Sequence, residues 1–159
     1  MHRWAPIAIG LVLAACGESA RDALEQARKA LAETNYSAAV AAADAGLARN
    51  SDAVTSWGLE IVKLEALARA GRGDETLAQL EKLAAAHPEH MQADQFVATA
   101  DQLRGAGQGA AAVGAIDLGL KRFPDDKALR AQIEQAKAKA KAAPDDAELE
   151  RLRTLGYIN

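Results

Sequence analysis

Three stretches of the 159-residue sequence can be laid over one another: "NYSAAVAAADAGLARNSD" (residues 35–52), "RGDETLAQLEKLAAAHPE" (72–89) and "QGAAAVGAIDLGLKRFPD" (108–125). They share a small residue, an apolar residue next to it and another four positions on, and a proline or serine near the end. In register are Ala39, Thr76 and Ala112; Val40, Leu77 and Val113; Ala43, Leu80 and Ile116; and Ser51, Pro88 and Pro124. The small residues lie 37 and then 36 residues apart. A fixed period of this length indicates a repeated structural unit.

The composition favours helices for these units. Apolar residues make up 50% of the chain but aromatic residues only 4%, and much of the apolar share is alanine. Alanine is the strongest helix former, and no segment shows the sustained alternation of β-branched and aromatic residues that is typical of strands. The sequence therefore predicts an all-α fold.

Each of the three stretches follows another helical pattern, at about residues 19–33, 53–70 and 90–104. The connections read "ETNY", "AGRGD" and "GAGQG", which contain residues that end helices or adopt positive φ. Three helical hairpins are predicted over residues 19–125.

These hairpins resemble the tetratricopeptide repeat, a unit of about 34 residues with two antiparallel helices. The shared features are the small residue early in the second helix, the apolar residue four positions later, the closing proline, and Tyr36 where that family usually opens the second helix with an aromatic residue. The resemblance implies a right-handed α-solenoid. The chain departs from the family in its longer period, in Ser51 in place of a proline, and in first helices without the family's Trp, Leu-Gly and Tyr signature.

Two further helices are predicted beyond the hairpins. Residues 126–143 form a capping helix, apolar toward the third hairpin and polar toward water, and residues 144–159 contain a short amphipathic helix that ends at Gly156. The apolar positions are Leu129, Ile133, Ala136 and Ala140 in the first and Leu149, Leu152 and Leu155 in the second. Two roles remain open for the last segment: it packs back on the array, or it is an exposed docking peptide.

The N-terminus, "MHRWAPIAIGLVLAAC", has the layout of a secretory signal peptide over residues 1–15: a basic residue, an apolar run and small residues. The run is shorter than the roughly 20 residues that span a bilayer. The ending "LAAC" resembles the bacterial lipoprotein signal, which implies cleavage before Cys16 and attachment of acyl chains to it. Residues 16–18 would then be a short linker. Gly17, where inner-membrane lipoproteins usually carry Asp, favours the outer membrane, facing the periplasm.

Cys16 is the only cysteine of the chain, so it cannot form an internal disulfide. A catalytic thiol needs a histidine within reach, and neither His87 nor His90 has a sequence context that suggests this role. Lipidation is the interpretation that fits the motif and its position.

No catalytic or metal-binding constellation is predicted, and the protein is expected not to be an enzyme and to need no cofactor other than the covalent lipid. The acidic pairs follow prolines and open helices, where carboxylates cap free amide groups; they are Asp125 with Asp126, and Asp145 with Asp146. His87 and His90 flank Pro88, which breaks the helix that would align them for a metal. The Gly-rich turns do not have the context of a phosphate loop.

The charge excludes one class of partner. The formal net charge is −3 and becomes about −4 once the predicted signal peptide with Arg3 is removed. Such a domain lacks the positive field that nucleic acids require. Nucleic acids are therefore not expected as ligands, and without a catalytic constellation no small-molecule substrate is expected either.

The remaining candidate site is a partner-binding groove. In the tetratricopeptide family the first helices of the hairpins line such a groove, so the resemblance implies a mixed apolar and charged lining. Its residues are Leu24, Arg28 and Leu31 in the first unit, Ile61, Glu65 and Arg69 in the second, and Val97, Asp101 and Arg104 in the third. The alternative is an ordinary solvated face without a ligand.

These features together predict a membrane-anchored lipoprotein that acts as a protein-interaction scaffold or assembly factor for a complex of the bacterial envelope. One alternative is a structural accessory subunit of a membrane complex that is held through other helix faces. A more remote alternative is a regulator of a periplasmic enzyme.

Overall fold

The computed structural model describes residues 19–142 and 147–159, and every regular element in these two ranges is an α-helix. The helices are α1 (Ala20–Ala32), α2 (Tyr36–Leu47), α3 (Ala53–Arg69), α4 (Gly73–Ala86), α5 (Ala93–Gly105), α6 (Gly109–Arg122), α7 (Lys127–Ala142) and α8 (Ala147–Thr154). The prediction of an all-α fold is confirmed. The predicted signal peptide, Cys16, residues 17 and 18, Asp145 and Asp146 lie outside the described residues.

Polar side chains fix the starts of α1 and α3. Ser19 accepts a hydrogen bond from the backbone N–H of Asp22 at 3.2 Å, while the Asp22 carboxylate accepts from the Ser19 N–H at 2.9 Å. At the start of α3, Asp52 accepts from the Thr55 N–H at 2.9 Å. Hydrogen bonds from Ser19 lower the pKa of Asp22, and those from Thr55 lower the pKa of Asp52, because they stabilise the charged carboxylate. Both carboxylates are thus engaged by their own helices.

The turn of each hairpin has the same backbone geometry. Thr34, Gly71 and Gly107 have φ angles of 58°, 71° and 77°. Each stands two residues after the last residue of its helix, where left-handed backbone commonly closes an α-helix. Because they are also 37 and 36 residues apart, the period seen in the side chains is repeated in the backbone.

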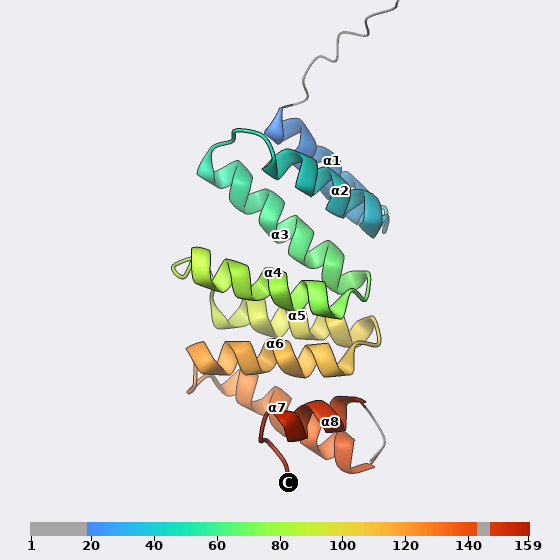
Figure 1. Ribbon diagram of the computed structural model, residues 1–159, viewed down its shortest axis with the longest axis vertical. Coiled ribbons are helices and arrows are strands. Elements are labelled where there is room, and N and C mark those ends of the chain that lie inside the picture. Colours follow the sequence, from blue (N-terminus) through green and yellow to red (C-terminus); the bar gives the residue numbers. More distant parts are fainter. Residues whose placement is uncertain (1–18, 143–146) are drawn as a thin grey trace, which may run out of the picture.

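The helices pack in a recurring order (Figure 1). The odd-numbered helices follow one another, with α1 against α3, α3 against α5 and α5 against α7. Among the even-numbered helices, α4 packs against α6 and α6 against α8. Figure 1 shows α1 and α2 at one end of the long axis and α7, α8 and the C-terminus at the other. The described chain is thus helical and repeat-like.

The residues that define the repeat lie in the interior. The small residue of each unit and the apolar residue four positions later are fully buried, with 0% of their surface exposed: Ala39, Thr76, Ala112, Ala43, Leu80 and Ile116. Residues of α2, α4 and α6 at these positions pack against neighbouring helices, so the sequence period coincides with a period in burial. The buried residues of α7 are likewise the four expected from its pattern: Leu129, Ile133, Ala136 and Ala140.

The same register continues into α8, which the sequence analysis did not recognise. Counting 36 residues on from Ala112 and Ile116 reaches Glu148 and Leu152, which are 1% and 0% exposed. A glutamate fits at the position of a small residue because a Cβ on Gly109 would lie only 2.9 Å from Glu148 Oε2. Lys139 lies 2.6 Å from the same carboxylate oxygen. α7 and α8, which the sequence predicted to be a capping helix and a short C-terminal helix, therefore pack together as a further helix pair after the three hairpins.

Buried apolar residues form one large cluster and two small ones. The large cluster extends from α3 to α8 and contains Phe96 and Met91, whereas the small clusters join α1, α2 and α3 largely through alanine and a few larger side chains. Most of the apolar core is therefore in the C-terminal two thirds of the described helices.

The C-terminal tail packs on the large cluster. Leu155, Tyr157 and Ile158 are partly buried against it, and the Tyr157 hydroxyl donates a 2.9 Å hydrogen bond to Asp117, which also pairs with Lys121 at 2.8 Å. Burial, followed by the hydrogen bond to the Asp117 carboxylate, raises the pKa of Tyr157 to about 12. Of the two roles left open for this segment, the structure displays the packed one.

None of the helices within the described ranges combines the length and apolar character needed to cross a bilayer.

Candidate functional site

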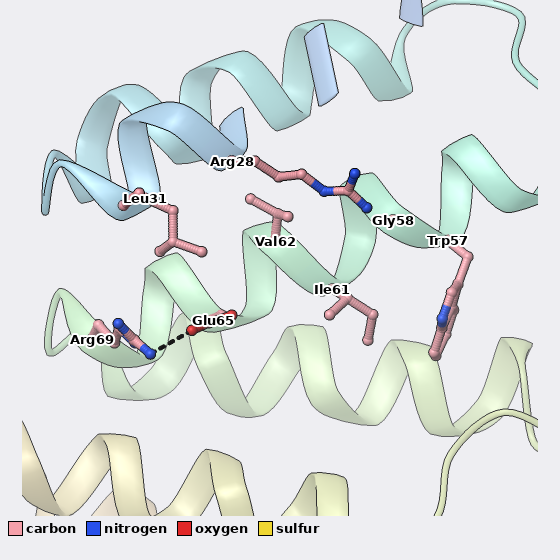
Figure 2. A pocket seen from close by; sticks show the side chains of 9 residues that line it. Arg28, Leu31, Trp57, Gly58, Ile61, Val62, Glu65 and Arg69 are labelled. Carbon is pink, nitrogen blue, oxygen red and sulfur yellow. Dashed lines mark ion pairs between the residues drawn. The ribbon is translucent and has the colours of Figure 1, made fainter. Parts of the chain in front are cut away.

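A pocket of about 480 Å³ lies between α1 and α3 (Figure 2). We call it the α1–α3 groove. Its lining residues are Arg28, Leu31 and Ala32 from α1 and Trp57, Gly58, Ile61, Val62, Glu65 and Arg69 from α3. Apolar side chains form much of the surface, and three charged residues stand around them, so the groove can hold a ligand group that is partly apolar and partly charged.

Gly58 lies in the interior of α3, where glycine costs roughly 0.5–1 kcal/mol relative to alanine. A Cβ at this position would lie 3.0 Å from Leu24 Cδ2 and 3.6 Å from Arg28 Nη2. The missing side chain therefore lets α1 approach α3 and leaves space beneath the Arg28 guanidinium. Figure 2 shows Arg28 extending from α1 toward Gly58.

The charges of the groove are unevenly matched. Arg69 pairs with Glu65 at 2.6 Å, one turn apart on α3. Arg28 is exposed and forms no hydrogen bond or ion pair within the described part of the chain. The groove therefore offers one uncompensated positive charge next to Leu31 and Ile61.

Three aromatic rings lie close together at one side of the groove, and one of them, Trp57, lines it. The ring of Trp57 lies 5.4 Å from that of His87 and 5.2 Å from that of His90, measured between centroids. Trp57 is half-buried, so part of its ring is open to a ligand. It is one of two tryptophans in the chain. The sequence analysis missed Trp57. The signal that could have identified it was a tryptophan placed between the start of a predicted helix and the predicted groove residue Ile61.

The two histidines act as neighbours of Trp57 in this arrangement. Their rings are 6.2 Å apart, and His90 Nε2 lies 3.4 Å from a carboxylate oxygen of Glu89. Among the described residues, no three His, Cys, Asp or Glu side chains come together as a metal site. The carboxylate of Asp126, by contrast, accepts a 2.9 Å hydrogen bond from the Leu129 N–H at the start of α7, as a cap does.

Five of the nine predicted groove residues line the pocket: Arg28, Leu31, Ile61, Glu65 and Arg69. Leu24 does not. It is 7% exposed and belongs to a core cluster, because the close approach at Gly58 places its side chain between the helices. The prediction for Leu24 is corrected accordingly.

The third-unit residues also differ from the prediction. Val97 packs against the large core cluster. Asp101 accepts hydrogen bonds from Gln132 at 2.9 Å and from Arg104 at 3.3 Å, and Arg104 also donates to the Gln132 amide oxygen. Because Gln132 belongs to α7, Asp101 and Arg104 hold α5 to α7 and do not line the α1–α3 groove.

A smaller hollow of about 150 Å³ continues from the groove toward α5. It shares Ile61 and Glu65 with the groove and adds Gln95, Thr99 and Gln102 on α5, with Leu64 and Ala98 completing the lining. The two hollows thus adjoin at Ile61 and Glu65, and the smaller one has neutral polar side chains on α5.

The described helices form a repeat-like all-α fold with a hollow between α1 and α3. Comparisons with models of protein families, with curated proteins and with solved structures find no match to this chain.

Proposed function

We propose that this protein is a lipid-anchored scaffold of the bacterial cell envelope, facing the periplasm from the outer membrane, and that its α1–α3 groove binds a protein partner. The "LAAC" sequence at Leu13 to Cys16 supports the anchor. The recurrence of buried positions, turn geometry and helix contacts supports a tetratricopeptide-like, right-handed solenoid. Such arrays bind partners through an extended concave surface.

The observation that carries this proposal is the groove itself. Gly58 opens space under a positive charge that is not paired among the described side chains, and the surrounding lining is apolar. A partner segment with an apolar side chain beside a carboxylate would bury the first against Leu31 and Ile61 and pair the second with Arg28. Trp57 adds a flat surface of the kind that is enriched at binding hot spots. Binding, and not catalysis, is the role that this lining supports.

A matched pair of charge reversals tests the groove. Arg28→Glu and Lys29→Glu change the same charge on adjacent residues of α1, but Arg28 lines the groove and Lys29 does not. We expect Arg28→Glu to remove the partner from complexes purified out of detergent-solubilised membranes, whereas Lys29→Glu retains it. Loss of the partner in neither variant would argue for a structural subunit held through other helix faces.

The anchor has its own test. Intact mass of the membrane-extracted protein is expected to correspond to a chain that begins at Cys16 and carries added acyl groups. Cys16→Ser is expected to abolish that modification. A membrane-extracted protein that starts at Met1, or that has a free Cys16 thiol, would refute the anchor.

A further inference from the structure

We infer that the N-terminal end of the helix stack lies directly on phospholipid headgroups, with Val54 facing the bilayer and Arg21 paired with lipid phosphate. We call this surface the anchor end: the first turn of α1, the α2–α3 connection and the first turn of α3. The inference rests on the proposed lipid anchor at Cys16. It goes further, because an acylated residue alone does not determine which protein surface meets the membrane.

The starts of α1 and α3 form one continuous surface. Residues from both starts and from the connection before α3 line a shared hollow of about 310 Å³: Ser19, Ala20, Arg21, Asn50, Ser51, Asp52 and Thr55. Arg49 donates a hydrogen bond to the Ser19 carbonyl at 3.4 Å and so joins the connection to α1. Figure 1 shows this surface at the end of the long axis opposite the C-terminus.

The covalent distance to the anchor is short. Three peptide steps separate Cys16 from Ser19, and even a fully extended chain covers only about 10 Å in that number of steps. Acyl chains on Cys16 would therefore hold Ser19 within about that distance of the headgroups. The anchor end is the surface that surrounds Ser19, so it is the surface presented to the bilayer.

The chemistry of the anchor end matches headgroups. Val54 is 81% exposed, and within the described residues it is the large hydrophobic side chain that is exposed to this degree. In the same first turns, the Asp22 carboxylate accepts hydrogen bonds from the N–H and hydroxyl of Ser19, and the Asp52 carboxylate accepts from the N–H and hydroxyl of Thr55. Arg21 is exposed and forms no hydrogen bond or ion pair to any described residue. This surface thus has one exposed apolar side chain and one positive charge without a hydrogen-bond or ion-pair partner among the described residues, and lipid phosphate complements that charge.

A site-specific fluorophore tests this orientation. Cys16 is the only native cysteine, so once it is acylated, Val54→Cys supplies a single thiol for bimane labelling. The lipidated protein is placed in vesicles of phosphatidylethanolamine and phosphatidylglycerol that contain a headgroup-level spin-labelled lipid. Thr154→Cys, an exposed position on α8 near the opposite end, is the matched control. We expect at least twofold stronger quenching at position 54 than at position 154.

A second variant tests whether Arg21 contacts the headgroups or the anchor end merely lies near them. Arg21→Glu in the Val54→Cys background is expected to reduce the quenching toward the level of the position 154 control, while Lys29→Glu leaves it unchanged. Circular dichroism checks that both variants remain helical. Equal quenching at positions 54 and 154, or no effect of Arg21→Glu, would overturn the inference.

Intact mass separates the failure of this inference from that of the anchor. If the purified protein carries acyl groups on Cys16 but position 54 is not preferentially quenched, the orientation is wrong and the lipid anchor stands. If Cys16 carries no acyl groups, the anchor and the orientation are both wrong.

Discussion

Gly46 is the position at which a single methyl group tests how closely α2 approaches its neighbours. It lies buried near the end of α2. A Cβ there would lie 2.8 Å from both Cδ atoms of Leu59 on α3 and 3.0 Å from the Cβ of Ala23 on α1. Leu59 is 0% exposed and Ala23 only 2%, so both contacts lie in the interior. Gly46→Ala therefore requires the Leu59 side chain or the neighbouring helices to shift.

The net effect follows from two opposing contributions. Alanine in place of glycine in a helix stabilises the chain by about 1 kcal/mol, whereas overpacking a filled interior costs about 1–3 kcal/mol. We expect Gly46→Ala to lower the free energy of unfolding by up to about 2 kcal/mol, which corresponds to a fall in Tm of up to ~8 °C at roughly 4 °C per kcal/mol for a domain of this size.

Gly105→Ala is the control. Gly105 ends α5, and no atom lies within 4 Å of the position its Cβ would take, so the substitution is expected to raise stability by about 0.4–1 kcal/mol. Thermal and urea unfolding of both variants, followed by circular dichroism, measure the difference. Adding Leu59→Ala to Gly46→Ala should cost less than the sum of the two single changes. Equal stabilisation by Gly46→Ala and Gly105→Ala would refute the close approach of α2.

Three other outcomes are expected. Stability is expected to fall as the pH rises from about 10 to about 12, because in that window unfolded tyrosine ionises while folded Tyr157 does not; Tyr157→Phe should flatten this part of the pH profile relative to the wild type. Leu80→Ala and Ile116→Ala each remove a fully buried side chain and should cost about 2–5 kcal/mol in urea unfolding. Asp101→Asn should leave partner binding intact and cost no more than about 1 kcal/mol, since its contacts are at an exposed junction; loss of binding would return Asp101 to the groove.

Repetition made the interior predictable. Leu80 and Ile116 could be assigned to the core because a matching position recurs in the next unit, and a residue that must pack between two similar helices is constrained in the same way each time. The buried face of α7 followed from the 3.6-residue period alone. Both signals depend only on local sequence and on helix geometry.

The groove was less predictable because its shape depends on how far neighbouring helices separate. Gly58 draws α1 toward α3 and buries Leu24, a displacement that no period in the sequence encodes. Asp101 was assigned by register, but Gln132 on α7 offers it a partner that lies 31 residues away in the chain. Glu148 concealed the last repetition because a charged residue stands where the earlier units carry a small one, and only Gly109 opposite explains how it fits.

The uneven division of the apolar core implies that this chain does not come apart everywhere at once. In stacked helical units stability is a sum of local terms and nearest-neighbour interfaces. The alanine-rich clusters around α1 and α2 contribute less of it than the Phe96-containing cluster that follows. Amide protons of α1 and α2 should accordingly exchange with deuterium sooner than those of α5 and α6. If the protein is anchored at Cys16 as proposed, a pull transmitted through the N-terminus would unfold the first hairpin while α5 and α6 stay folded.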